Sequence, residues 1–170
     1  MKALARITFA FSLLAAAASV AAVPRAQAQD IARNSVYIEL LGNGGLYSLN
    51  YDRKITNNVS ARVGLMAFGG ESTDGDRIGL SLVPLMANYL VGKHNHRLEL
   101  GGGPVVAYAA GNIKEHGIGE FSDFGLVGTA TFGYRYQPLQ GGFNFRLGFT
   151  PLFSASSVAP SFGVSFGYGF

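Results

Sequence analysis

The side chains best suited to chemistry in this sequence are a histidine, a serine and an aspartate that lie close together in the chain. His116 is followed by Ser122 and Asp123, the residue types that supply a base, a nucleophile and an orienting acid in acyl transfer. Such a group works only when the imidazole reaches the hydroxyl. We interpret the three residues as part of a solvated polar loop, because short motifs of this kind are weak evidence for a catalytic site.

The other two histidines, His94 and His96, could bind a metal ion only with a third ligand, which the neighbouring sequence does not supply. The glycine run at 101–104 lacks the lysine of a phosphate-binding loop. The acidic segment at 69–76 lacks the ligand spacing of a calcium loop. The sequence therefore predicts no catalytic residue, no cofactor and no metal site.

A second set of charged residues lies within segments in which polar and apolar residues alternate. Each member falls on the face opposite the large apolar residues, and the set comprises Glu39, Arg62, Glu99, Arg135 and Arg146. Buried ions need partners, because a lone buried charge is strongly destabilising. We predict that the five side chains point into the lumen of a barrel and pair there. The alternative is that they are unrelated solvated charges on a soluble sheet.

Eight segments have the period-two alternation of β-strands. They cover residues 34–41, 46–55, 59–68, 77–91, 97–109, 124–136, 143–150 and 161–170. Pro84 and Pro104 interrupt two of them, and because proline cannot donate to a β-ladder we expect a bulge or a change of register there. The connections after the second, fourth and sixth strands are short, and three of the other four are longer. The pattern predicts an all-β fold, an eight-stranded antiparallel up-and-down transmembrane barrel.

The composition of the polar face indicates which side of the sheet meets lipid. A soluble barrel of the lipocalin type alternates too, with its apolar face turned inward. A solvated outer face would carry many lysines, yet beyond the first 28 residues only Lys54, Lys93 and Lys114 occur, all at strand ends or in loops. The polar positions within strands are mostly glycine, serine, threonine and asparagine, which suit a narrow lumen. We therefore expect the apolar face to contact lipid, with a soluble periplasmic ligand-binding barrel as an alternative.

The beginning of the chain has the layout of a secretory signal peptide. Lys2 and Arg6 precede an apolar run, and a small-x-small triplet at 26–28 predicts cleavage before Gln29, which assigns residues 1–28 to the signal and 29–170 to the barrel domain. Removing Lys2, Arg6 and Arg25 leaves ten of the 13 basic residues, which match the ten acidic ones. The remaining chain is formally neutral and has no basic stripe, so nothing in it favours nucleic-acid binding.

The last ten residues, SFGVSFGYGF, place aromatic or apolar residues on alternate positions and include Phe166, Tyr168 and Phe170. This segment resembles the carboxy-terminal signature of bacterial outer-membrane barrels, and the resemblance implies recognition by the barrel assembly machinery. The segments NSVYIELLGNGGLYSLNYDR, GYRYQP and GGFNFRLGFTP resemble a group of small, uncharacterised outer-membrane barrel proteins, similar in architecture to OmpA- or OmpX-like barrels.

The resemblance implies a protein exported to the outer membrane of a Gram-negative bacterium, surrounded by outer-membrane lipid, and it transfers no settled activity. We expect a non-enzymatic structural or surface-interaction role. An enzyme that modifies lipid A is a second alternative, because some small barrels of this architecture are enzymes of that kind.

Overall fold

The computed structural model describes residues 31–71, 76–113 and 119–170. The predicted signal peptide, and with it the cleavage position, lies outside these ranges, as does His116. Within the described part of the chain, no helix is long and apolar enough to cross a membrane.

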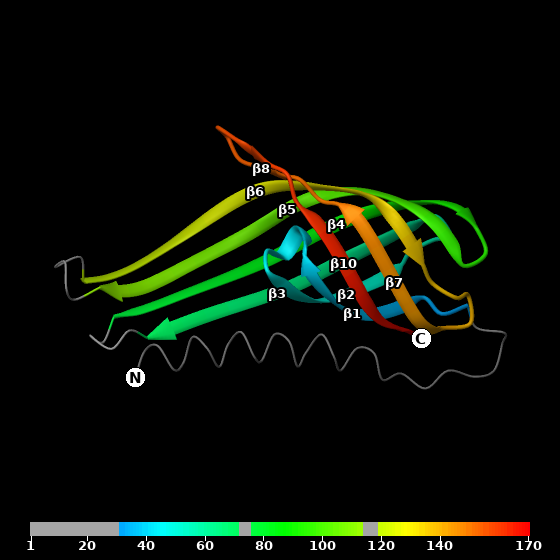
Figure 1. Cartoon of the computed structure of the whole chain (residues 1–170), viewed down its shortest axis with the longest axis horizontal. Coiled ribbons are helices and arrows are strands. Elements are labelled where there is room, and N and C mark those ends of the chain that lie inside the picture. Colours follow the sequence, from blue (N-terminus) through cyan, green and yellow to red (C-terminus); the bar gives the residue numbers. More distant parts are fainter. Residues whose placement is uncertain (1–30, 72–75, 114–118) are drawn as a thin grey trace. The chain divides into compact units, whose positions relative to one another are not determined.

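The described chain consists almost entirely of antiparallel strands (Figure 1). Their bounds are β1 (Asn34–Leu41), β2 (Tyr47–Lys54), β3 (Val59–Glu71), β4 (Arg77–Lys93), β5 (His96–Ile113), β6 (Gly119–Tyr136), β7 (Gly142–Phe149), β8 (Leu152–Phe153), β9 (Val158–Ala159) and β10 (Phe162–Gly169). A short 3₁₀ helix, η1 (Gly42–Gly44), connects β1 to β2. Strands β1 to β7 pair in sequence order, and β10 pairs with both β1 and β7. The sheet closes on itself, and the predicted eight-stranded up-and-down barrel is confirmed.

Alternation along the strands places polar side chains inside the barrel and apolar ones outside. In β1, Tyr37 and Glu39 are buried, whereas Val36, Ile38 and Leu40 are exposed. Within the closed barrel, the other strands show the same arrangement. Exposed large apolar residues are numerous around the barrel, and the buried residues are mainly Ser, Asn, Asp, Glu and Arg. A soluble barrel has the opposite arrangement, since its apolar face forms the core. The interior of the closed barrel is therefore mainly polar, with a few apolar side chains such as Met86 and Leu90.

Small residues on the lumen face make room for the larger ones. Gly167 of β10 lies opposite Tyr37 of β1, and a Cβ atom at position 167 would overlap the Tyr37 side chain and the carbonyl oxygen of Val36. At Gly64, a Cβ atom would overlap the amide of Asn50. Crowding in the lumen thus accounts for the glycine at position 167 of β10.

Four strands continue beyond the closed barrel and form a curved sheet that we call the flap. It consists of Met66–Glu71, Arg77–Leu82, Ala107–Ile113 and Gly119–Gly125, which belong to β3, β4, β5 and β6. The neighbouring strands stop short, because β2 pairs with β3 only up to Leu65 and β7 pairs with β6 only up to Phe132. β1 begins and β10 ends at one end of the barrel, which we call the terminal end. Figure 1 shows the flap extending from the other end.

The flap corrects the loop lengths expected from the sequence. Residues 111–113 and 119–123 were expected in a long polar loop, but they form the ends of β5 and β6. Residues 69–71 likewise extend β3. Cross-strand pairing accounts for this, since Gly111 pairs with Phe121 and Glu71 with Arg77 across antiparallel ladders. Residues 152–153 and 158–159 form the small hairpin β8–β9, which joins the sheet beside β6.

The register expectation at the two prolines is wrong. Residue pairs between β4 and β5 keep one register from Arg77↔Asn112 to Lys93↔His96, and those between β5 and β6 do so throughout. The β4 ladder lapses locally beside Pro84, but the strand continues without an inserted residue. Because the register is continuous, Ile78, Leu80 and Leu82 lie on the same face as Asn88 and Leu90, which is the lumen face. In the flap, therefore, the apolar side chains of β4 face inward.

Candidate functional site in the barrel lumen

The five charged residues predicted to line the lumen all lie inside it. Glu39, Arg62, Glu99, Arg135 and Arg146 come from β1, β3, β5, β6 and β7, and none is more than 5% exposed. Each stands on a strand whose neighbouring positions point outward, so alternation alone brings the five side chains into the interior. They form two groups at different heights.

The first group, towards the flap, is built on the ion pair between Glu39 and Arg62. The Arg62 guanidinium also donates from Nε to Asn50 Oδ1 at 3.0 Å and from Nη1 to Asn43 Oδ1 at 3.2 Å. Ser48 Oγ lies 3.5 Å from Glu39 Oε2. Each of the three guanidinium nitrogens of Arg62 therefore has an acceptor, as a buried guanidinium requires.

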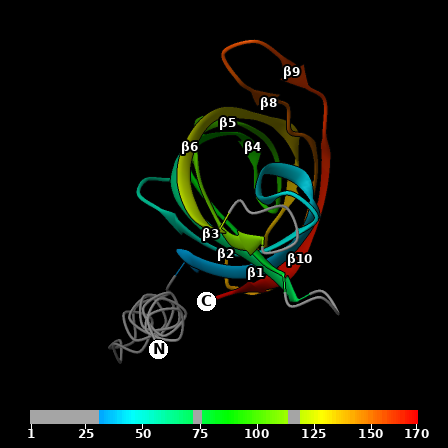
Figure 2. The ribbon, with the colours of Figure 1, turned by 90° about the vertical axis from the view of Figure 1, so that its left-hand side faces the viewer.

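Helix η1 brings Asn43 into the lumen from the flap end (Figure 2). Asn43 is fully buried, and its Nδ2 donates to Thr129 Oγ1 at 2.5 Å and to the Ala130 carbonyl at 3.1 Å. Thr131 Oγ1 donates to the amide oxygen of Asn43 at 3.2 Å. The connection between β1 and β2 thus folds inward and ties β1 to β6 across the barrel, closing the lumen at this height.

The second group, towards the terminal end, is centred on Arg135 and Asp52. Arg135 Nη2 lies 2.5 Å from Asp52 Oδ1, and Nη1 lies 3.3 Å from Oδ2. The side chain of Gln137 accepts from Nε and Nη2 of the same guanidinium at 2.8 Å and 2.5 Å. Ser60 Oγ donates to Asp52 Oδ2 at 2.9 Å. Both members of the pair are completely buried.

Arg146 joins the second group as a neighbour of Arg135. The two arginines are cross-strand partners on β6 and β7, and like charges in that position repel each other. Asp52 and Glu99 offset this repulsion, because Arg146 Nη1 lies 3.5 Å from Asp52 Oδ2 and 3.4 Å from Glu99 Oε1. Glu99 Oε1 also lies 3.5 Å from Arg135 Nη1. Each carboxylate therefore serves both arginines.

Tyr37 separates the two groups. The Arg146 guanidinium lies 3.9 Å from the centre of the Tyr37 ring, and the Arg62 guanidinium lies 5.5 Å from it. Arg146 Nη1 also donates to the Tyr37 hydroxyl at 3.0 Å. Tyr37 thus contacts one arginine from each group, which makes cation–π contacts part of the lumen packing.

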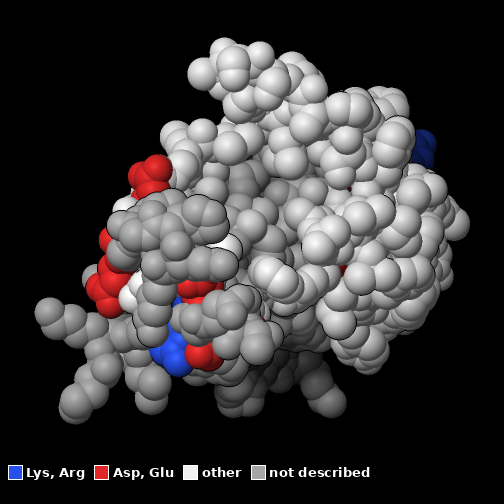
Figure 3. Space-filling view, turned by 60° about the vertical axis from the view of Figure 1, so that its left-hand side comes forward, with Lys and Arg blue, Asp and Glu red and all other residues white. Residues whose placement is uncertain are grey.

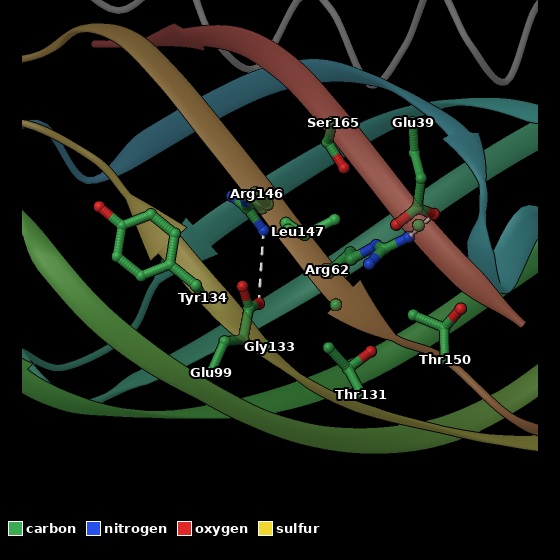
Figure 4. Close-up of a pocket in the computed structure, with 12 residues that line it drawn as sticks. Glu39, Arg62, Glu99, Thr131, Gly133, Tyr134, Arg146, Leu147, Thr150 and Ser165 are labelled. Carbon is green, nitrogen blue, oxygen red and sulfur yellow. Dashed lines mark hydrogen bonds and ion pairs between the residues drawn. The ribbon is translucent and has the colours of Figure 1, made fainter.

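A small cavity of about 10 Å³ remains between the groups (Figure 4). Glu39 and Arg62 line one side of it and Glu99 and Arg146 the other, and Thr131 and Ser165 are among the other lining residues. A volume of this size accommodates about one water molecule. Side chains therefore occupy most of the lumen at this height.

The sequence analysis missed several lumen residues, among them Asp52, Tyr37, Asn43 and Gln137. Asp52 lies on the face of β2 opposite Tyr51, so alternation identifies its side, but its place near the strand end concealed its part in the network. Tyr37 carries the same alternation signal, which places it on the face of Glu39, but it was left out of the predicted network because that network was chosen by charge. Asn43 lies in a turn, and no periodic signal indicates that the turn folds inward.

The residues considered for catalysis do not form a site in the described part of the chain. Ser122 and Asp123 are adjacent on β6 and therefore point to opposite faces of the flap. Asp123 Oδ1 accepts a hydrogen bond from the backbone of Phe124 at 2.8 Å. His96 Nδ1 lies 2.6 Å from the Tyr134 hydroxyl at the terminal end. Among the described residues, no three His, Cys, Asp or Glu side chains come together as a metal site.

Comparison with solved structures identifies the fold of this chain. No protein-family model matches the sequence, and no curated protein matches it. The N-terminal β-barrel domain of Pseudomonas aeruginosa OprF superposes with a TM-score of 0.58 at 17% identity, covering 81% of this chain and 98% of that one. The fold is that of a small outer-membrane β-barrel. Neisserial surface protein A (NspA) matches this barrel with a TM-score of 0.50 at 12% identity, over 80% of this chain and 94% of that one.

Proposed function

We propose that this chain is a non-enzymatic protein of the bacterial outer membrane, in which the closed barrel is the membrane anchor and the flap is the surface-interaction part. The observation that carries the proposal is the inverted arrangement of side chains. A continuous belt of exposed Val, Ile, Leu, Phe and Tyr surrounds a lumen of ion-paired and amide side chains. Lipid favours such an exterior, and closure of the sheet removes the free strand edges that a bilayer cannot accommodate.

Strand lengths support the same assignment. A tilted strand needs about 9–11 residues to cross a bilayer. Strands β1, β2, β7 and β10 have 8 residues each, close to that length, whereas β4, β5 and β6 have 17, 18 and 18. Relative to a spanning length of about 9–11 residues, the excess extends roughly 20–30 Å along the strand direction. In this proposal, the flap stands outside the bilayer, where its outer side exposes Phe124, which is 73% accessible.

The test is cell fractionation followed by electrophoresis of boiled and unboiled samples. We expect the protein in the outer-membrane fraction, with a band that changes mobility on heating, because a closed barrel resists detergent until it is heated. A soluble periplasmic protein without a mobility change would refute the proposal. A change in the mass spectrum of lipid A that depends on Ser122 would replace the non-enzymatic role with an enzymatic one.

A further inference from the structure

Charged side chains outside the lumen are segregated between the two ends of the barrel. Every described acidic residue is either in the lumen or at the tip of the flap, where Glu71, Asp76, Glu120 and Asp123 occur with one cation, Arg77. Figure 3 shows acidic side chains gathered at the flap end. At the terminal end the exposed charged side chains of the described residues are basic.

We define the basic rim as Arg33, Arg53, Lys93 and Arg97. The Arg33 carbonyl accepts a hydrogen bond from the Lys54 backbone at 2.7 Å, which places Arg33 at the terminal end beside β2. Arg97 donates to the Asn57 carbonyl in the turn between β2 and β3. Arg33, Arg53 and Lys93 are exposed, and within the described ranges none of the three forms an ion pair.

Residues of the basic rim lie just beyond outward-facing tyrosines of the barrel wall. Arg53 is two residues beyond Tyr51 on the outward face of β2, and Lys93 is four residues beyond Tyr89 on the outward face of β4. Tyrosine rings settle at the level where acyl chains meet headgroups. One or two further steps along the strand bring the cationic groups to the level of the phosphates.

A buried lysine lies beneath the basic rim. Lys54 follows Arg53 on the lumen face and is 4% exposed, and its Nζ has no hydrogen-bond partner among the described residues. The nearby carboxylate, Asp52, is already paired with Arg135 and Arg146. Burial disfavours the charged form of an unpaired ammonium group, so Lys54 is not counted among the cations of the basic rim.

With the flap at the cell surface, the terminal end faces the periplasm. We propose that the basic rim binds the headgroups of anionic phospholipids of the phosphatidylglycerol type in the inner leaflet of the outer membrane. The charge complementarity is direct, since unpaired cations stand at phosphate height with no exposed Asp or Glu side chain near them in the described chain. Each cation at a membrane surface strengthens association with anionic lipid roughly fivefold. The inference rests on the proposed membrane location and adds a lipid preference and an orientation to it.

The experiment reconstitutes the protein into vesicles of phosphatidylethanolamine with a minor fraction of phosphatidylglycerol. The barrel is then released with limiting detergent, and the lipids that remain bound are identified by native mass spectrometry. We expect phosphatidylglycerol to be enriched over its bulk fraction, and the enrichment to fall with added salt. In the variant Arg33→Gln/Arg53→Gln/Lys93→Gln the enrichment should fall on the order of tenfold or more.

The matched control changes three charges at the other end of the barrel, Glu71→Gln/Glu120→Gln/Asp123→Asn, and should leave the enrichment unchanged. Equal enrichment in wild type and the rim variant, with both proteins still shifting on boiling, would overturn the lipid preference and leave the membrane location intact. A protein that does not enter the vesicles or shift on boiling would overturn both. Rim-dependent binding to purified cell-wall sacculi, without a lipid preference, would assign the rim to that anionic polymer instead.

Discussion

Arg135 on β6 and Asp52 on β2 form an ion pair across the lumen, with 2.5 Å between Nη2 and Oδ1, although 83 residues separate them in the chain. The pair joins strands from opposite sides of the barrel, so it depends on closure of the sheet. Desolvating two charges costs free energy, and the neighbouring Gln137 and Ser60 offset that cost by completing the hydrogen bonds of both groups.

Asp52→Asn should strongly destabilise the barrel. The variant leaves Arg135 and Arg146 adjacent with only Glu99 between them, and breaking a buried pair from one side costs about 3–5 kcal/mol. Urea unfolding of the detergent-refolded protein, followed by the gel-mobility change, measures the loss. Asp123→Asn is the control, because this exposed flap carboxylate should change the free energy of unfolding by no more than about 0.5 kcal/mol. Equal stabilities of the two variants would show that the lumen pair is energetically neutral.

Glu99→Gln should cost less than Asp52→Asn, because the contacts of Glu99 with both arginines are longer, at 3.4 Å and 3.5 Å. The double variant should cost more than the sum of the single ones, since no carboxylate then remains beside either arginine. A double-mutant cycle on the free energy of unfolding measures this coupling. Additive losses would mean that the two carboxylates act independently.

The fold was accessible from the sequence because alternation is a local property that survives into the structure. The eight strands, the polar lumen face and the outward aromatic residues of β7 and β10 all follow from it. Closure into one barrel follows as well, because short connections bring consecutive strands together as antiparallel neighbours.

The flap shows where that reasoning stops. Ile78, Leu80 and Leu82 alternate as regularly as residues of an outward face. They are nevertheless an even number of residues away from Asn88, so they lie on the lumen face and not on the outward face of Tyr89. Because a register change was expected at Pro84, the sequence analysis did not show that the apolar residues of β4 face inward before Pro84 and outward after it.

The lumen network was only partly predictable from the sequence. Which carboxylate meets which arginine depends on strand stagger, and the contribution of Asn43 depends on a turn that folds inward.

Asn43→Ala should loosen the connection between β1 and β2. Asn43 is hydrogen-bonded to Arg62, Thr129, Thr131 and the Ala130 carbonyl, and its loss leaves several of these groups unsatisfied at about 1–3 kcal/mol each. Hydrogen–deuterium exchange should increase in residues 42–46 before it increases in β1 and β2. Ser122→Ala on the flap is the control and should leave this exchange unchanged. Unaltered exchange in the Asn43 variant would show that the backbone alone holds η1 in the lumen.

Gly167→Ala should impair folding, because its Cβ atom would overlap Tyr37 and the Val36 carbonyl. Gly70→Ala on β3 is a matched control, since no atom lies within 4 Å of the Cβ position there. The yield of heat-shifting protein after refolding into detergent distinguishes the two substitutions. If both variants refold equally well, β1 and β10 can separate enough to admit a methyl group, and crowding does not explain the glycine.

Phe166, Tyr168 and Phe170 remain a predicted assembly signal, and their effect in cells should exceed their effect in a test tube. All three side chains are exposed on the outside of the barrel end, where Phe166 contacts Phe145 with ring centres 5.4 Å apart. Replacing the three with serine should sharply reduce outer-membrane protein in cells. Replacing Phe143, Phe145 and Phe149 of β7 with serine removes a comparable aromatic surface and should reduce it less. Refolding into detergent should be similar for the two variants, because both lose the same kind of lipid contact. Equal losses in cells would mean that these aromatic residues serve lipid contact alone and carry no separate recognition role.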